Sequence, residues 1–367
     1  MNIYLDCSHM KPDTFTGIQV FTLNFLKELS KNLNKNLKII TQYPELFDFI
    51  SKDKILVLNS FFRDKKNHWK KRFIWFQFFL PYLLKKDDIL ISASNDLPYY
   101  GSFKKVVVVH DVIPLEYPNG VPLFTKWYFK YNVKFCISKS DLIFTVSEIS
   151  KKKILKYTKI EENKIKVIPP GVNHLGRNYV NDDGKLNNII KNVNNYFLIV
   201  NPNLPHKNFK NMILAFLNSE ICNKAKLIVV GELNFENQKL IQNKNNVIHY
   251  PKVSNYELQM LYKNSIAVIN CSFVEGFSLV PFEAALFEKP SIVSFNIPPA
   301  QYLKNAVLEC DPNDILSMAT AINKMYYLYV NKPEEYRKMG SLAKNLTKEL
   351  TWENYVKKFL DELLKLF

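Results

Sequence analysis

Short apolar runs rich in β-branched residues alternate with longer helical patterns along this 367-residue chain, and this alternation constrains its fold more than any other feature. It is typical of βαβ units, in which helices join parallel strands and cover the sheet. In the first half, strands are expected at Asn2–Leu5, Leu37–Ile40, Ile55–Leu58, Ile89–Ser92, Val106–Val109, Leu142–Val146 and Lys166–Ile168. Helices are expected between them, at Ile18–Ser30, Trp69–Leu84, Val121–Ser138 and Ser147–Tyr157.

The pattern stops at Pro169-Pro170-Gly171 and the polar stretch 173–195, and then starts again. Prolines lack an N–H donor and favour a turn, so we place a domain boundary between residues 170 and 171. The second half predicts strands at Tyr196–Val200, Leu227–Val230, Val247–His249, Ile266–Asn270, Ser291–Ser294 and Val307–Glu309. Its helices are expected near Phe209–Leu217, Asn255–Asn264, Leu279–Phe287, Ile315–Leu328 and Pro333–Lys348.

We therefore predict an α/β protein with two doubly wound, Rossmann-like domains that face a central cleft, because a chain of this length can fill two cores. The domains are residues 1–170 and 171–350. The last segment, 351–367, has apolar residues at helical spacing, and we expect this helix to pack back on the N-terminal domain. Ligands of such sheets bind outside the carboxyl ends of the strands.

Composition narrows the class of protein. The formal net charge is +16, and residues 1–169 hold 28 basic and 16 acidic side chains, so the first half is expected to meet an anionic partner. No apolar run is long enough for a membrane-spanning helix. The five cysteines have no CxxC spacing, which argues against a disulfide framework or a zinc site. We expect a cytoplasmic protein.

The segment from Glu275 to Glu283 carries the strongest signal of chemistry. Glu283 lies in a run of apolar residues, where an ionised carboxylate is costly unless it is paired. Pro281 suits a first helical turn, so the amides around Ser278–Val280 are expected to bind an anion such as a phosphate. The alternative is a half-exposed helix start with Glu283 in a salt bridge.

A second anion site is predicted in the loop that ends in His206-Lys207-Asn208, where Lys207 would supply a positive charge beside helix N-terminal amides. Taken alone, this lysine is more typical of a solvated loop end. Two such loops at one site suit a diphosphate, whose charge grows as it leaves.

In the first half, His110 and Asp111 follow the predicted strand Val106–Val109, at the edge where ligands bind. A structural histidine is an equally good reading of that position. Gly17, before the first helix, offers close backbone approach to a ligand.

Several motifs are missing from the sequence, namely GxGxxG, Asp-x-Asp, HExxH, GxSxG and the Walker A loop. Their absence argues against NAD, FAD, a metal-dependent diphosphate site, a serine nucleophile and a P-loop. We expect neither a metal nor a cofactor.

Taken together, these segments resemble the family 4 glycosyltransferases of the GT-B fold, which retain anomeric configuration and use nucleotide sugars. The most specific match is the E-x7-E motif, formed by Glu275 and Glu283 with Gly276-Phe277 between them. Other matches follow in the family's order: His110 to Leu115, Val146 to Ser150, Val167 to Val172, His206 to Asn208, Val253-Ser254 and Glu309 to Pro312.

The resemblance implies roles for single residues. Glu275 would contact the sugar hydroxyls of the donor, and Glu283 would accept hydrogen bonds from its ribose. Lys207 would neutralise the diphosphate. The other implied contacts are made by His110 beside the donor sugar, Asp111 near the acceptor, Gly17 at the phosphates, and His206, Val253, Gly276, Phe277, Ser278 and Leu279 around the donor.

The implied function is transfer of a hexose, with mannose from GDP-mannose as the leading donor, to a glycan or polyprenyl-linked acceptor. The products would be surface polysaccharides such as lipopolysaccharide or capsule. The alternatives are a sugar-nucleotide epimerase or a phosphorylase of the same architecture, and a basic nucleic-acid-binding protein. No nucleic-acid-binding motif occurs, so nucleic acid is not the expected partner.

Residues 61–86 combine eight basic and nine aromatic residues with one acidic residue. Such a segment suits an anionic membrane surface and would place the enzyme at the inner face of the cytoplasmic membrane. The alternative is an ordinary helix with a buried face formed by Trp69, Phe73, Phe76, Leu80 and Leu83.

Overall fold

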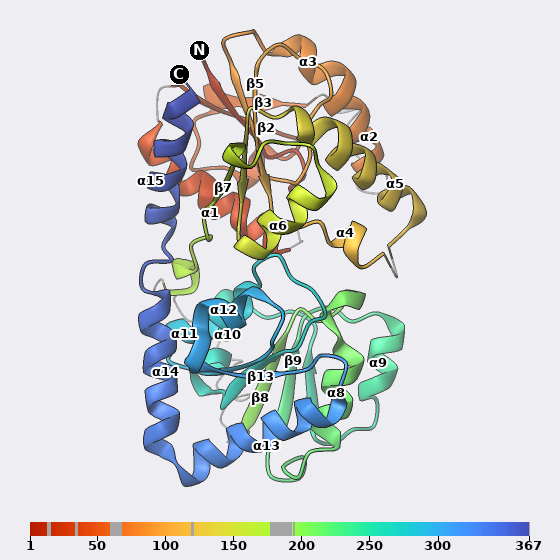
Figure 1. The fold of residues 1–367 in the computed structure, drawn as a ribbon, viewed down its shortest axis with the longest axis vertical. Helices are drawn as coiled ribbons and strands as arrows, with labels where there is room; N and C mark the ends of the chain where they lie inside the picture. The colour runs from red at the N-terminus through yellow and green to blue at the C-terminus, as the bar shows by residue number, and fades with distance from the viewer. Residues whose placement is uncertain are drawn as a thin grey trace. The chain divides into compact units, whose positions relative to one another are not determined.

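The computed structural model describes residues 1–12, 16–33, 36–58, 68–118, 121–176, 193 and 195–366, without the side chains of residues 68 and 69. These residues form two compact units (Figure 1). Unit 1 comprises Met1–Gly171 together with Trp352–Phe367, and unit 2 comprises Val172–Thr351. The chain thus leaves unit 1 and returns to it for its last segment.

Unit 1 is built on a parallel sheet of seven strands in the order β3-β2-β1-β4-β5-β6-β7. The chain moves outward from β1 to β3 and then crosses to β4, which makes the gap between β1 and β4 a topological switch point. The strands are β1 Ile3–Asp6, β2 Leu37–Thr41, β3 Ile55–Val57, β4 Ile89–Ser92, β5 Lys104–Val109, β6 Leu142–Thr145 and β7 Ile165–Val167.

Unit 2 has a parallel sheet of six strands in the order β10-β9-β8-β11-β12-β13. The same reversal occurs between β8 and β11. The strands are β8 Tyr196–Val200, β9 Lys226–Val230, β10 Val247–Tyr250, β11 Ala267–Asn270, β12 Ser291–Ser294 and β13 Val307–Cys310. The predicted α/β architecture with two parallel sheets is therefore confirmed.

Helices cover these sheets (Figure 1). Those of unit 1 are α1 Gly17–Asn32, α2 His68–Ile74, α3 Leu80–Leu83, α4 Ile113–Glu116, α5 Leu123–Tyr131, α6 Glu148–Tyr157 and α15 Trp352–Leu363. Those of unit 2 are α8 Phe209–Leu217, α9 Phe235–Ile241, α10 Asn255–Asn264, α11 Leu279–Leu286, α12 Pro298–Leu303, α13 Ile315–Asn331 and α14 Pro333–Thr347.

The C-terminal helix α15 belongs to the core of unit 1. Its ring of Trp352 lies 5.3 Å from that of Phe21 on α1, centroid to centroid, and Phe359 lies 4.9 Å from Phe25. Phe359 also contacts Phe144 of β6 at 4.2 Å. All five rings are at most 2% exposed, so α15 fills the space between α1 and the sheet.

Two predicted helices are interrupted by π-helical turns, at Trp75–Phe79 and Asn132–Cys136. A π turn holds one more residue than an α turn and shifts the register of everything after it. The expected buried face is therefore wrong at its end: Leu83 is 51% exposed and Leu84 is buried in its place. Phe76 and Leu80 are buried as expected, whereas the side chain of Trp69 and residues 61–67 lie outside the described residues.

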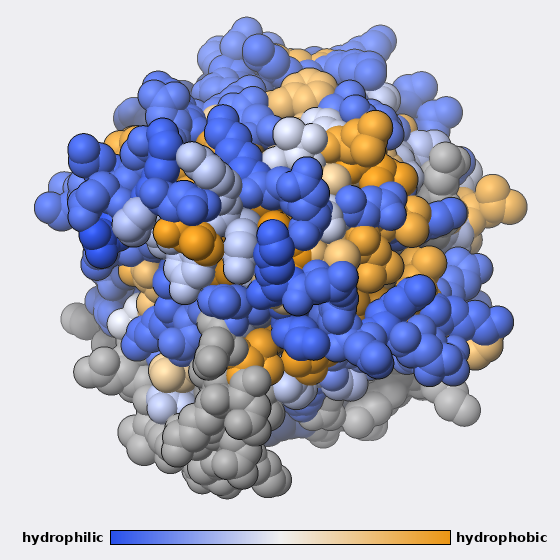
Figure 2. Space-filling view, turned by 90° about the horizontal axis from the view of Figure 1, so that it is seen from below, coloured by the Kyte–Doolittle hydropathy of each residue, from blue (hydrophilic) through white to orange (hydrophobic). Residues whose placement is uncertain are grey.

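On the face that Figure 2 shows, hydrophilic residues cover most of the surface, and the hydrophobic ones gather mainly toward the right of the view. Within the described part of the chain, no helix is long and apolar enough to span a bilayer.

Candidate active site

The loop after β11 and the start of α11 form a rigid corner in unit 2. Ser278 caps α11 with a φ of 68°, in the left-handed region that non-glycine residues seldom adopt. Its hydroxyl accepts a hydrogen bond of 2.8 Å from Asn270 Nδ2. Phe277 stacks on Phe282 with 4.3 Å between ring centroids. These contacts hold the backbone turn that begins the helix, where N–H groups are left without helical partners.

Glu275 is paired with Lys207 at this corner. Lys207 Nζ lies 2.8 Å from Glu275 Oε1 and 3.0 Å from Oε2, and the Ser272 hydroxyl donates to Oε1 at 2.7 Å. Burial pushes the pKa of Glu275 upward, but the Lys207 charge and these hydrogen bonds outweigh it and lower the pKa below its usual value. The structure thus brings together two residues that lie 68 positions apart in the sequence.

The loop that carries Lys207 is fastened to the neighbouring loops by Asn208. Its side-chain amide donates to the carbonyl oxygens of Cys271 at 2.8 Å and Pro312 at 2.7 Å. The carbonyl of His206 accepts from the Phe273 N–H at 2.9 Å. Asn208 has a φ of 61°, and asparagine tolerates that left-handed conformation better than most residues. Lys207 therefore enters the site from a fixed backbone.

His206 lies half-buried beside Lys207. Burial lowers its pKa to about 4, with the charge of Lys207 acting in the same direction and Glu275 opposing it. The imidazole is therefore neutral at neutral pH, and Lys207 is the cation of this loop.

Glu283, the second acid of the motif, has two protein partners. The Tyr262 hydroxyl donates to Oε2 at 2.6 Å, and His174 Nε2 lies 3.1 Å from Oε1. Burial raises the pKa of Tyr262, with the neighbouring Glu283 carboxylate as a further cause, so the phenol stays protonated. The expectation that this carboxylate needs a partner is met within the protein, by residues that sequence reasoning did not single out.

The remaining predicted donor residues also belong to unit 2. Gly276 is buried between Glu275 and Phe277, and Leu279 is the half-buried first residue of α11. Val253 is half-buried in the loop between β10 and α10, directly before Ser254, whose hydroxyl caps α10.

Gly231 is a position that the sequence analysis missed. It directly follows β9 with a φ of 117°, and a Cβ atom there would lie 2.6 Å from Asn201 Oδ1 and 3.1 Å from Asn201 Cα. Only glycine fits such an approach without strain. The two neighbouring loops at the carboxyl edge of unit 2 are therefore in direct contact.

In unit 1, His110 is held firmly at the carboxyl end of β5. Its Nε2 lies 3.0 Å from the Ala93 carbonyl oxygen, its N–H donates to Asn95 Oδ1 at 2.6 Å, and its ring contacts Phe21 at 4.5 Å. Burial lowers the pKa of His110 to about 4, against the opposing effect of the bond to Ala93. A neutral imidazole that donates to a carbonyl is a poor general base at neutral pH.

Asp111 and Gly17 occupy the same edge of unit 1. Asp111 Oδ1 accepts from the Ile113 N–H at 3.0 Å, a side-chain turn directly before the short helix α4. Gly17 is the exposed first residue of α1, one turn before Phe21, which contacts His110. A Cβ at Gly17 would meet no atom of the described residues within 4 Å. Packing against that part of the chain therefore does not require glycine at this position.

A buried charge cluster at the switch point of unit 1 had no signal in the sequence. Arg72 of α2 pairs with Asp6 at 2.7 Å and with Asp96 at 2.5 Å, and its Nε donates to the Ser8 hydroxyl at 2.8 Å. Burial would lower the pKa of Arg72, but Asp96 and Asp6 outweigh it and raise the pKa. Arg72 thus fastens α2 to the ends of β1 and β4.

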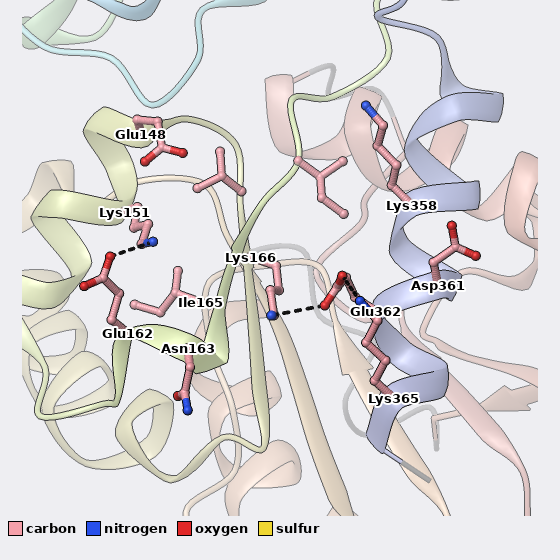
Figure 3. Close-up of a pocket in the computed structure, with 12 residues that line it drawn as sticks. Glu148, Lys151, Glu162, Asn163, Ile165, Lys166, Lys358, Asp361, Glu362 and Lys365 are labelled. Carbon is pink, nitrogen blue, oxygen red and sulfur yellow. Dashed lines mark hydrogen bonds and ion pairs between the residues drawn. The ribbon is translucent and has the colours of Figure 1, made fainter.

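A groove of about 710 Å³ in unit 1 lies between α6, β7 and α15 (Figure 3). Its basic residues pair with its acidic ones: Lys151 lies 2.8 Å from Glu162, and Lys166 lies 3.2 Å from Glu362. No predicted site residue lines it. Because the lining charges compensate one another, the groove does not offer the cationic surface that a diphosphate needs.

Among the described residues, no group of three or more histidine, cysteine, aspartate and glutamate side chains is placed to hold a metal ion.

Two known families match the sequence over its two halves. Glycosyltransferase Family 4 matches residues 15–174, and Glycosyl transferases group 1 matches residues 185–346. The chain is a family 4 glycosyltransferase. This glycosyltransferase is 26% identical to the O-antigen chain mannosyltransferase RfbU of Salmonella typhimurium over 328 residues, which cover 85% of this chain and 88% of that protein.

Solved structures agree with the GT-B fold of this glycosyltransferase. Sucrose-phosphate synthase from Thermosynechococcus elongatus is similar with a TM-score of 0.75 and 15% identity, over 100% of this chain and 99% of that one. HepE of Anabaena, solved in complex with UDP and glucose, is similar with a TM-score of 0.73 and 15% identity over the full length of both chains. The fold and the family predicted from the E-x7-E motif are confirmed.

Proposed function

We propose that this glycosyltransferase moves mannose from GDP-mannose to a glycan or polyprenyl-linked acceptor during synthesis of a surface polysaccharide, with retention of anomeric configuration. The Lys207–Glu275 pair carries this proposal, because it places a cation and a carboxylate side by side at the carboxyl edge of a parallel sheet. The similarity to a mannosyltransferase supports the choice of sugar.

Donor binding would redistribute the contacts of this pair. Lys207 Nζ would turn from Glu275 to the diphosphate, and Glu275 would accept hydrogen bonds from the sugar hydroxyls instead. Amides between Gly276 and Leu279 would bind the phosphate and sugar at the start of α11. As the bond between sugar and phosphate breaks, negative charge grows on the phosphate, and Lys207 and the amides would stabilise it without a metal.

Glu283 would bind the ribose hydroxyls of the nucleotide. Tyr262 and His174 hold its two oxygens 2.6 and 3.1 Å away, so the carboxylate is oriented before the donor arrives. Each carboxylate oxygen has more than one lone-pair site, so Glu283 can accept from ribose while Tyr262 stays bound.

The acceptor would bind unit 1 near Asp111, whereas His110 would contact the donor sugar and Gly17 the donor phosphates. Because Nε2–H of the neutral His110 donates to Ala93, its Nδ1 would act as a hydrogen-bond acceptor toward a hydroxyl rather than as a base. A polyprenyl-linked acceptor would be presented at the inner face of the cytoplasmic membrane, and the basic, aromatic segment 61–86 would hold the enzyme there.

Donor choice is tested by measuring nucleotide release from GDP-mannose, GDP-fucose, UDP-glucose and UDP-galactose, each with and without a lipid-extract acceptor. We expect acceptor-dependent release from GDP-mannose and a product with the donor's anomeric configuration by NMR. Turnover with a UDP-sugar and none with GDP-mannose would refute the proposed donor. A product with inverted anomeric configuration would refute the retaining mechanism. Conversion of the sugar nucleotide without an acceptor would indicate an epimerase.

The role of Glu275 is tested by Glu275→Gln, which keeps the size of the side chain and removes its charge. We expect kcat to fall at least about a hundredfold, as for loss of one transition-state contact. Glu236→Gln, on an exposed position of α9 in the same unit, is the matched control. Equal activity of the two variants would refute the assigned role.

A further inference from the structure

The helix α5 and the turn after it carry a row of aromatic side chains on their outer face. Phe124, Trp127, Tyr131 and Phe135 follow one another at helical spacing, with successive ring centroids 5.8, 5.9 and 5.3 Å apart. We call these four residues the aromatic row. Phe124 is 44% exposed, Trp127 59% and Phe135 43%, and Leu123 before them is 83% exposed. A continuous apolar surface of this kind marks an interaction site.

An adjoining face of this segment anchors it to unit 1. The Tyr128 ring contacts Phe73 of α2 at 5.2 Å, and its hydroxyl donates to Asp96 at 3.3 Å. Asn132 and Val133, in the turn after α5, are buried. The segment therefore has one face bound to the protein and a second face left to solvent.

Along the sequence, lysines and no acidic residues accompany the aromatic row. Residues 121–140 contain Lys126, Lys130, Lys134 and Lys139 and neither aspartate nor glutamate. The last three of these lysines are exposed. Lys134 Nζ lies 5.4 Å from the centroid of the Phe135 ring. The surface is thus apolar at its centre and positively charged around it.

The neighbouring helical segment adds a second apolar surface. Phe73 contacts Tyr128 of α5 on one side and Phe78 of its own segment on the other. Figure 1 shows α2 and α5 side by side in unit 1. Five large hydrophobic side chains of this segment are 45% to 89% exposed: Ile74, Phe78, Phe79, Tyr82 and Leu83.

From these features we infer that the aromatic row is a membrane-binding surface, which inserts its rings into the interface of a bilayer rich in anionic lipid. Aromatic rings favour the interfacial region, and lysines around them attract anionic headgroups. Single-stranded nucleic acid also stacks on aromatics. It gains nothing, however, from exposed aliphatic groups such as Leu123 and Leu83, whereas lipid does. This inference rests on the proposed function in one respect. The membrane would be the one that carries the lipid-linked acceptor.

Vesicle co-sedimentation of the full chain, without nucleotide, tests this surface. We expect binding to vesicles with 30% phosphatidylglycerol and none to pure phosphatidylcholine. Lys130→Glu/Lys134→Glu should weaken binding at least about 25-fold, from roughly fivefold for each lysine near an anionic surface. Trp127→Ser/Phe135→Ser should weaken it about tenfold or more.

The matched control is Lys324→Glu/Lys338→Glu, which changes two exposed lysines of unit 2 and alters net charge equally. Equal weakening by the two lysine pairs would mean that net charge alone drives binding, and would overturn the inference. So would an absence of vesicle binding, or binding that neither row variant weakens. Tighter binding to single-stranded DNA than to the vesicles would assign the surface to nucleic acid instead.

A spectroscopic readout covers the case in which a double variant fails to fold. Trp75 and Trp352 are buried, whereas Trp127 is exposed. In a Trp69→Phe background, vesicles should therefore shift the emission to the blue, and Trp127→Phe should abolish that shift. A shift that survives Trp127→Phe in this background refutes the insertion. Vesicle binding does not depend on the donor, so Glu275→Gln should bind vesicles as the native protein does. The membrane test can therefore succeed even if the proposed donor is wrong.

Discussion

Replacing Lys207 by methionine removes one charge from the pair at the candidate active site and nearly keeps the volume. In the native protein, Glu275 is 6% exposed and receives its only cationic contacts among the described residues from Lys207, at 2.8 and 3.0 Å. Lys207 and the Ser272 hydroxyl both donate hydrogen bonds to this buried carboxylate. The variant removes the first donor and leaves the second. We expect it to destabilise unit 2.

The size of the effect follows from the burial of each partner. Removing one member of a buried ion pair costs about 3–5 kcal/mol, and the 23% exposure of the Lys207 side chain places this case near 3 kcal/mol, because water reaches the site. Glu275→Gln leaves only a lysine that can turn to solvent, which costs about 1 kcal/mol. The double variant should resemble Glu275→Gln, so the two changes are coupled by roughly 2–3 kcal/mol.

The sign of the pH dependence is a second test. The pKa of Glu275 is lowered in the folded state, so its stabilising effect is complete above the unfolded pKa of about 4.3 and is lost as the pH falls through the lower folded value. In Lys207→Met, burial instead favours the neutral acid. The stability difference between native protein and variant should therefore shrink toward pH 4.

Calorimetry measures these differences, and tryptophan fluorescence helps to assign the transitions. All four tryptophans, Trp69, Trp75, Trp127 and Trp352, lie in the sequence ranges of unit 1. If the units unfold separately, Lys207→Met should lower a calorimetric transition that fluorescence does not report. Additivity of the two single variants within about 0.5 kcal/mol, or a stability difference that does not change with pH, would refute the pairing and its burial.

Four further substitutions test other parts of the structure. Tyr262→Phe removes a 2.6 Å hydrogen bond to the buried Glu283 carboxylate and should cost about 1.5–3 kcal/mol in chemical denaturation; a loss below about 0.5 kcal/mol would contradict that bond. Gly17→Ala should change the free energy of unfolding by no more than about 0.5 kcal/mol and should raise the donor KM. Gly231→Ala should lower the free energy of unfolding by about 1–3 kcal/mol because of its positive φ. Similar melting temperatures of the two variants would argue against this contrast. Arg72→Met leaves two buried aspartates without their cation, and it should lower the free energy of unfolding of unit 1, followed by tryptophan fluorescence, by about 3–5 kcal/mol. An unchanged free energy would show that the cluster contributes nothing to stability.

Sequence periodicity located the elements well where each had one clear period. The strands of both sheets, and helices such as α8 and α10, lie at or within a few residues of their expected places. The short helices α9 and α12 went unnoticed, since seven and six residues give too little periodicity. The first π turn could not be foreseen, because the four consecutive residues from Phe73 to Phe76 are all apolar. Such a run fits the buried face of an α-helix with or without the extra residue of a π turn.

The candidate site was only half visible in the sequence. Glu275, Glu283 and Lys207 stood out through spacing and context, but their partners did not. Tyr262 and His174 reach Glu283 from other elements, and such contacts depend on packing across many residues. Arg72 was hidden for a different reason: it lies in a run of basic residues, and only the fold shows that this member turns inward to two aspartates.

The return of the chain to unit 1 has a consequence for biosynthesis. Residues 1–171 leave the ribosome with the surface around Phe21, Phe25 and Phe144 still uncovered, and α15, which covers it, is translated only after all of unit 2. The earlier-made half of the enzyme therefore finishes folding only after the later-made half has been synthesised. A stop codon just before Trp352 should therefore destabilise unit 1, although the missing residues follow unit 2 in the sequence.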